Sequence, residues 1–117
     1  MSYATYRKQA VRTASRSRLL LMLFEEADNR LTSARAKKPS QPGFVQDVHR
    51  VRAIYSELIS ALDVEAAPEL ATQLLPLYQW CVSELGASAR EPDRLAGVQR
   101  VTRTLSDAWF AAVRKIQ

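Results

Sequence analysis

One cysteine, one histidine and three glycines are all that the 117 residues offer of these types, and each scarcity excludes a class of site. Cys81 has no second cysteine for an internal disulfide, so we interpret it as a small buried apolar residue. His49 and Cys81 supply two soft ligands where a structural zinc site takes four, so we expect no metal. Three glycines cannot form a glycine-rich loop around a phosphate, and we interpret Gly97 as a relief of crowding.

The sequence also lacks a recognisable set of catalytic side chains. Glu25 and Glu26 are adjacent, so on a helix they diverge instead of converging as a pair of carboxylates would. No nucleophile stands at a recognisable spacing from a base and an orienting group. We therefore expect a binding protein that is not an enzyme, with no catalytic residues and no cofactor.

Long apolar runs are missing as well. The longest, residues 19–24, contains six residues and ends at Glu25, whereas a membrane span needs about 20. This run is also too short for the apolar region of a signal peptide. We expect no membrane insertion, a cytoplasmic location and, from the length of the chain, a single domain over residues 1–117.

Apolar residues recur at three- and four-residue spacing in four stretches, which predicts four helices. We expect them over residues 15–35, 44–62, 68–85 and from 92 to the end of the chain. Short connections between helices of similar length favour antiparallel neighbours, so the predicted fold class is all-α, an antiparallel up-down four-helix bundle. The inner faces are expected to contain Leu20, Phe24, Ala27, Leu31, Ala34, Val51, Tyr55, Leu58, Leu70, Leu74, Tyr78, Leu85, Val98, Leu105, Ala108 and Trp109.

Two residues decide the predicted shape of the third helix. Pro76 removes one hydrogen bond and its ring presses on the carbonyl of Thr72, at a cost of about 3 kcal/mol in a regular helix. We therefore expect a kink near Pro76. Gly86 is expected to adopt the left-handed conformation that ends a helix after Leu85.

The formal charge of +5 is concentrated near the N-terminus. Five lysines and arginines precede the first acidic residue, Glu25, and the remainder of the chain is balanced in charge. Because Ser15 is a good helix cap, we interpret residues 1–14 as a basic arm, extended or short helical, on a bundle of residues 15–117. The alternative is a small basic helical protein that binds nucleic acid, since such an arm could neutralise phosphates. The arm has no clear recognition helix, so no nucleic-acid partner is expected.

The chain has more apolar residues than the inner faces need. Residues 19–24 are apolar all around a helix, whereas about 100° of the circumference suffices to cover a core. Scattered surface apolar residues are normal, but as a group we interpret the excess as a groove for an amphipathic partner helix. The residues expected to face outward and bind a partner are Leu21, Met22, Ile54, Leu75, Trp80, Val82 and Phe110.

Several strings along the chain, in order, resemble one family, the flagellin-specific export chaperones of bacteria, FliS. They are Tyr3-x-x-Tyr6, Val11-x-Thr13-Ala14-Ser15, Met22-Leu23-Phe24, Ile54-x-x-Glu57-Leu58, Glu69-Leu70-Ala71, Leu77-Tyr78-x-Trp80 and Asp107-Ala108-Trp109. The resemblance implies a cytosolic bundle that holds the C-terminal helices of flagellin in apolar grooves, prevents premature polymerisation and delivers flagellin to the export gate. A helical interaction module of another secretion system is the alternative.

The basic arm carries a further hypothesis. Residues 63–89 contain four acidic side chains and no basic ones, so they complement the five positive charges near the N-terminus. We expect the arm to lie over the third helix of the empty protein, with Tyr3 and Tyr6 shielding apolar surface. The partner-binding residues expected on the arm are Tyr3, Tyr6 and Val11. The expected oligomeric state is a monomer or a weak homodimer.

Overall fold

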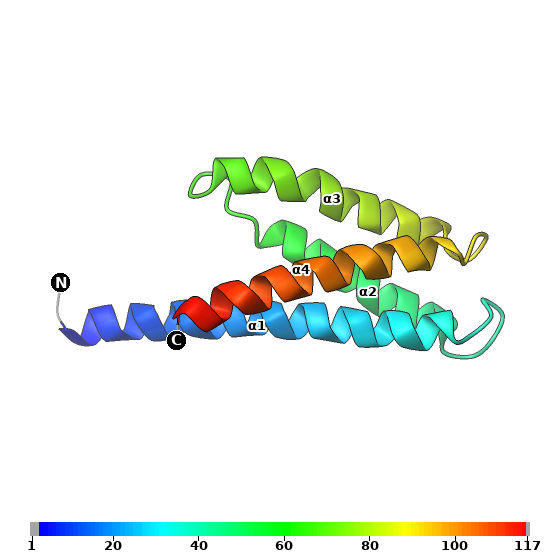
Figure 1. The fold of residues 1–117 in the computed structure, drawn as a ribbon, viewed down its shortest axis with the longest axis horizontal. Coiled ribbons are helices and arrows are strands. Elements are labelled where there is room, and N and C mark those ends of the chain that lie inside the picture. Colours follow the sequence, from blue (N-terminus) through cyan, green and yellow to red (C-terminus); the bar gives the residue numbers. More distant parts are fainter. Residues whose placement is uncertain (1–2, 117) are drawn as a thin grey trace.

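The structure, a computed structural model, describes the backbone of residues 3–116 and the side chains of residues 16–112 and Arg114. It contains four helices, which are α1 (Tyr3–Arg35), α2 (Phe44–Ser60), α3 (Pro68–Ala87) and α4 (Arg94–Ile116) (Figure 1). Successive helices run in opposite directions, and no strand occurs between residues 3 and 116. The predicted all-α up-down bundle is therefore confirmed.

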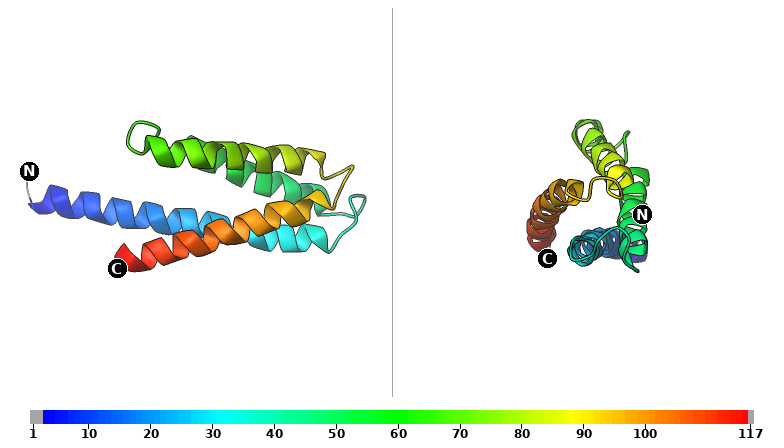
Figure 2. Two further views of the ribbon diagram at one scale, coloured as in Figure 1. Left: turned by 45° about the horizontal axis from the view of Figure 1, so that its top comes forward. Right: turned by 90° about the vertical axis from the view of Figure 1, so that its right-hand side faces the viewer.

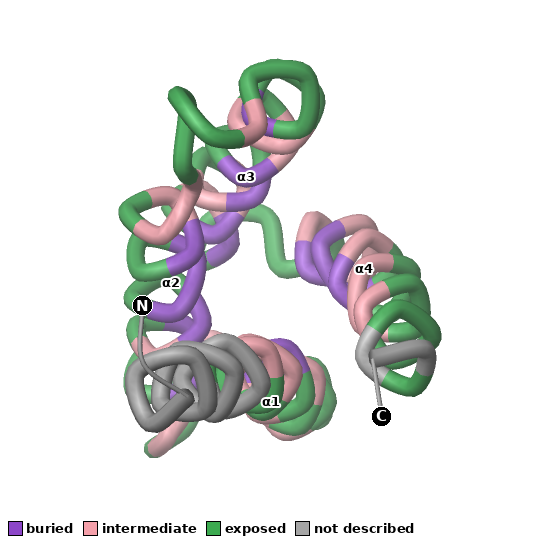
Figure 3. Tube along the Cα trace, turned by 90° about the vertical axis from the view of Figure 1, so that its left-hand side faces the viewer, coloured by how far each residue is buried: buried purple, intermediate pink, exposed green. Residues whose placement is uncertain are grey.

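The four helices form a ring around one core. α1 packs against α2 and α4, and α3 packs against the same two helices, so α1 and α3 lie at opposite corners. Viewed along the bundle, the buried residues line the inner side of each helix (Figure 3). The predicted inner face of α1 is confirmed, since Phe24, Ala27, Leu31 and Ala34 are all buried.

Ile54 does not face outward as predicted. Its side chain is fully buried, with 0% of its surface exposed, and it belongs to the core. The reason is that α2 contacts α1 as well as α3, so the buried part of its surface is wider than one narrow stripe. The outward assignment of Ile54 is therefore wrong.

The first helix begins earlier than predicted. α1 starts at Tyr3 instead of near Ser15, and it gives the molecule its long dimension of 57 Å (Figure 1). Residues 4–14 contain neither glycine nor proline, and extending a helix that already exists costs far less than nucleating one. Because the helix continues through Ser15, this residue does not act as a helix cap.

This continuous helix also conflicts with the hypothesis that residues 1–14 lie over the third helix. Within the described backbone, α1 approaches α2 and α4 but not α3. The side chains of Tyr3, Tyr6 and Val11 lie outside the described residues. Their proposed part in partner binding stays a prediction.

The ends of two helices differ from the prediction. α2 ends at Ser60, two residues early, and α3 continues through Gly86 to Ala87. Gly86 is not left-handed; the one glycine with positive φ among the described residues is Gly43 (φ 94°), which precedes α2. At the end of α3, the Ser88 hydroxyl donates a hydrogen bond to the Leu85 carbonyl at 2.7 Å and so ends the helix without glycine.

α3 continues across Pro76 as one helix. The proline is exposed, and so is Thr72, whose carbonyl lacks the hydrogen bond that Pro76 cannot donate. That carbonyl therefore lies on the side of the helix where water can reach it, which lowers the cost of the proline. The kink near Pro76 stays a prediction.

Candidate functional site

A groove opens at the end of the bundle that contains the start of α3 and the end of α4. We call this the open end, and the opposite end, with the connection of residues 88–93, the closed end. α3 and α4 diverge toward the open end (Figures 1 and 2). The groove encloses a volume of about 440 Å³. It is lined by Arg16, Ser17, Leu20, Phe24, Leu58, Ala61, Leu62, Asp63, Ala67, Leu70, Ala71, Leu74, Tyr78, Leu105, Ala108 and Trp109.

Small side chains leave this space unfilled. Ala61, Ala67, Ala71 and Ala108 line the groove and present only a methyl group to it. Protein interiors are normally filled to crystal-like density, so alanines just after α2, at the start of α3 and on α4 leave volume that the chain itself does not occupy. The groove is thus a property of the sequence as well as of the splayed helices.

The surface of the groove is mainly apolar. Phe24, Leu58 and Tyr78 are buried at its floor, and its sides include half-buried leucines of α1, α3 and α4 and Leu62, which follows α2. Leu70 at its edge is 47% exposed, although it was predicted to face inward. Ala108 is exposed for the same reason, because α3 and α4 are too far apart here to cover each other.

Two hydrogen bonds tie the helices together at the open end. The indole N–H of Trp109 on α4 donates to the Ser17 carbonyl of α1 at 2.9 Å. The guanidinium of Arg16 donates to the Ala61 carbonyl at the end of α2 at 3.3 Å. α1 therefore anchors both neighbours, whereas neither bond involves α3.

The rim beside α3 is acidic. Asp63 lines the groove and its carboxylate accepts hydrogen bonds from the backbone N–H groups of Glu65 and Ala66, at 3.1 and 2.9 Å. The side chains of Glu65 and Glu69 are exposed next to it. An occupant with basic residues along this side is therefore favoured electrostatically.

None of the described residues that were predicted to bind a partner lines this groove. Met22 (62%), Trp80 (41%) and Phe110 (49%) are exposed as predicted, but they lie on three different helices. Leu21 and Leu75 are half-buried, and Val82 packs against the core. The described members of the predicted set therefore do not form one groove around this space, and their part in binding stays a prediction.

Trp80, although exposed, also lies against α4. The Cη2 atom of its indole would lie 3.1 Å from a Cβ atom placed on Gly97 of α4. The missing side chain of Gly97 lets the ring bridge α3 and α4, which agrees with the interpretation that this glycine relieves crowding. Trp80 therefore marks where the two helices approach each other.

The sequence-based assignment missed the groove because its lining was assigned to the inner faces. Leu70, Leu74, Leu105 and Trp109 have the spacing of core residues, and spacing alone does not show that α3 and α4 separate. One signal was present in the sequence, namely the alanines at 61, 67, 71 and 108. Because successive helices run in opposite directions, all four alanines lie at the open end of the bundle.

Other kinds of site find no support in the described part of the chain. Residues 16–112 contain no group of three histidine, cysteine, aspartate or glutamate side chains placed to hold a metal ion. Across the described backbone, no helix is both long enough and apolar enough to cross a membrane.

Comparison with known proteins gives one finding. The sequence model of a family described as "Flagellar protein FliS" matches residues 1–116. The comparison with curated proteins gives no match.

Proposed function

The chain belongs to the FliS family of flagellar export chaperones, and we propose that its open-end groove binds the C-terminal helices of flagellin. Holding these helices in the cytoplasm prevents flagellin from polymerising before export. The occupied chaperone then presents flagellin to a component of the export gate. The observation that carries the proposal is the apolar groove of about 440 Å³ between diverging helices.

The shape of the groove favours a helix as its occupant. It lies between the diverging α3 and α4 and is also lined by α1 and α2, and an amphipathic helix can pack its apolar residues into such a groove. The structure presents no sheet edge between residues 3 and 116 to which an extended peptide could add a strand. The acidic rim at Asp63, Glu65 and Glu69 favours a helix with basic residues on one flank.

The energetics require several anchors. Burying one leucine-sized side chain contributes about 1.5–3 kcal/mol. Ordering a disordered partner costs about 2–5 kcal/mol or more. A helix that inserts three or four apolar side chains between Leu70, Leu74, Leu105 and Trp109 offsets that cost, whereas a single contact does not.

The test compares two exposed apolar residues, one in the groove and one outside it. Leu70→Asp places a charge at the groove edge, and Met22→Asp places the same charge on a part of α1 that does not line the groove. Both side chains are substantially exposed, so both variants should fold. Calorimetry with a peptide spanning the C-terminal helices of flagellin measures the affinities.

We expect Leu70→Asp to weaken binding at least tenfold, because a charge must lose water to enter an apolar contact. Met22→Asp should bind as the unchanged protein does. Equal affinities for all three proteins would place the flagellin site elsewhere. A loss in Met22→Asp alone would favour the outward residues that the sequence suggested.

A further inference from the structure

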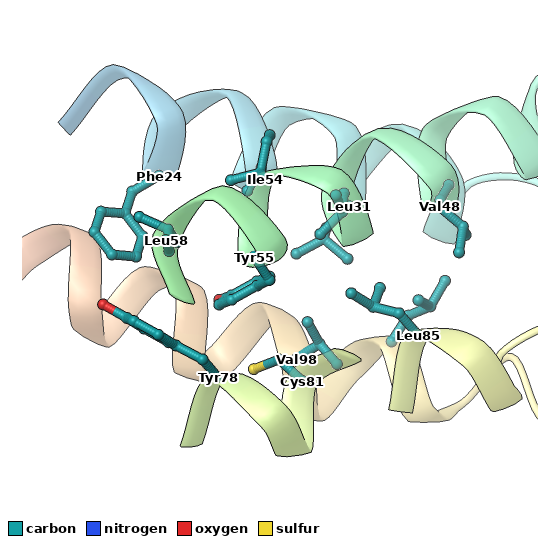
Figure 4. Packing of buried hydrophobic residues seen from close by; sticks show 14 of the residues in the cluster. Phe24, Leu31, Val48, Ile54, Tyr55, Leu58, Tyr78, Cys81, Leu85 and Val98 are labelled. Carbon is teal, nitrogen blue, oxygen red and sulfur yellow. The ribbon is translucent and has the colours of Figure 1, made fainter. Parts of the chain in front are cut away.

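One polar group on a largely buried side chain faces the groove and has no hydrogen-bond partner among the described residues. Tyr78 is 5% exposed, and its side chain reaches toward Phe24 and Leu58 at the groove floor (Figure 4). Among the described residues, its hydroxyl makes no hydrogen bond. A phenylalanine would occupy the same apolar space, so the hydroxyl adds nothing to the packing.

Its neighbour Tyr55 shows the contrast. The two rings are in contact, with centroids 5.8 Å apart and planes inclined at 59°. Tyr55 is also buried, but its hydroxyl bonds to the Thr102 hydroxyl at 2.5 Å inside the core. Tyr55 is therefore a satisfied core residue, whereas the Tyr78 hydroxyl remains available to a molecule in the groove.

We infer that the Tyr78 hydroxyl recognises a neutral hydrogen-bonding side chain, of serine, threonine, asparagine or glutamine, on the helix that occupies the groove. This inference rests on the proposed function and adds a specificity determinant to it. When the groove is empty, water can reach the hydroxyl through the opening. When an apolar helix excludes that water, only the occupant can supply the hydrogen bond.

The chemistry of the site selects a neutral acceptor. Burial, with the nearby Cys81, raises the pKa of Tyr78 to about 12, so the phenol keeps its proton and can donate near neutral pH. A carboxylate on the occupant would have to lose its water in an apolar groove whose rim already carries Asp63. A hydroxyl or amide side chain accepts the same bond without that cost.

The inference predicts selectivity among helices of equal hydrophobicity. A helix whose buried face is entirely apolar leaves the Tyr78 hydroxyl unpaired. A helix with one hydroxyl or amide at the matching position satisfies it. An unsatisfied buried group of this kind corresponds to about a tenfold or larger loss in affinity.

A double-mutant cycle with the flagellin C-terminal peptide tests this. Tyr78→Phe removes only the hydroxyl, and each serine, threonine, asparagine or glutamine of the peptide is replaced by alanine in turn. We expect Tyr78→Phe to lower the affinity about tenfold. One peptide substitution should lower the affinity of the unchanged protein similarly and leave that of Tyr78→Phe unaltered.

The matched control is Tyr55→Phe, which removes the hydroxyl of the neighbouring ring. It should lower the unfolding midpoint, because the buried Thr102 hydroxyl loses its bond to Tyr55 and keeps only the one it donates to the Val98 carbonyl, while the folded protein keeps its affinity within about twofold. If Tyr78→Phe binds as tightly as the unchanged protein, or if no peptide position couples to it, this inference is wrong and the proposed function stands. If the unchanged protein binds no flagellin peptide, the proposed function fails and this inference fails with it.

Discussion

The two ends of the bundle hold their helices together in different ways. At the closed end, Arg94 of α4 pairs with Glu84 of α3 at 2.6 Å, and the Trp80 indole lies against Gly97. At the open end, the described side chains of α3 and α4 form no such connection, and residues of both helices line a groove instead. The comparison teaches that the fold is secured at one end, which leaves the other end available for a partner.

Hydrogen-bonded polar side chains between α1 and its neighbours add to the contacts that hold the closed end together. Asp47 at the start of α2 is buried and accepts from Lys37 at 2.8 Å and from Arg30 at 3.1 Å. The buried side-chain amide of Gln99 on α4 donates to the Asp28 carboxylate at 2.9 Å and accepts from Arg35 at 2.7 Å. These contacts lie toward the closed end, where the stability of the bundle is therefore concentrated.

The largest expected effect compares one leucine from each region. Leu31→Ala empties a fully buried position near the closed end and should lower the free energy of unfolding by about 2–5 kcal/mol. Leu74→Ala widens a groove that is already open and should cost about 1.5 kcal/mol or less, because half-buried side chains lose less contact. Denaturant unfolding measures both. Equal losses would show that the two ends contribute alike.

A smaller effect is expected from the buried carboxylate at the closed end. Burial by itself would raise the pKa of Asp47, but hydrogen bonds from Lys37, Ser33 and Arg30 outweigh it and lower the pKa. Asp47→Asn should lower the free energy of unfolding at pH 7 by about 1–3 kcal/mol, because it removes the charge from both ion pairs.

The pH dependence gives a second measurement of the same site. A carboxylate whose pKa is lower in the folded state stabilises the fold above its unfolded pKa of about 3.9. That contribution is lost as the pH falls below about 4 and through the folded pKa. Denaturant midpoints at pH 7 and pH 3 should therefore differ less for Asp47→Asn than for the unchanged protein. An identical difference would contradict this role for Asp47.

The smallest effect compares a glycine of α3 that faces α2 with a glycine of α4 that faces α3. Gly86→Ala should raise the free energy of unfolding by about 0.5–1 kcal/mol, because a Cβ there would meet only the Arg52 guanidinium at 3.8 Å. Gly97→Ala should gain less, since its Cβ would lie 3.1 Å from the Trp80 indole and the ring must shift. Thermal unfolding of the two variants separates them. A larger gain for Gly97→Ala would mean that the close approach of Trp80 is not tight.

Local patterns predicted the helices well, and they predicted the site poorly. The spacing of Phe24, Leu31 and Tyr55 identified core residues because each helix has to bury one face whatever its neighbours are. The same spacing assigned Leu70 and Ala108 to the interior, where the divergence of α3 and α4 leaves them exposed. Ile54 was predicted to be exposed and is buried, because α2 packs against both α1 and α3.

The resemblance to FliS export chaperones, drawn from short strings of residues, is confirmed by the family match over residues 1–116. The predicted fold class is confirmed by the four helices. The fold class and the family resemblance could both be predicted because each depends on the order of residues along the chain. The start of the first helix was missed because capping is a local preference that an existing helix can override.

The sequence by itself determined that this protein is four antiparallel helices, which residues form most of their buried faces, and to which family it belongs. Periodicity and turn residues act over a few positions, so they can be read without knowing what lies across the core. Only the tertiary structure decided that α3 and α4 separate, that four alanines line the groove at that end and that the Tyr78 hydroxyl there has no hydrogen-bond partner among the described residues. These features depend on the angle and distance between helices far apart in the chain, which the packing of the whole bundle sets.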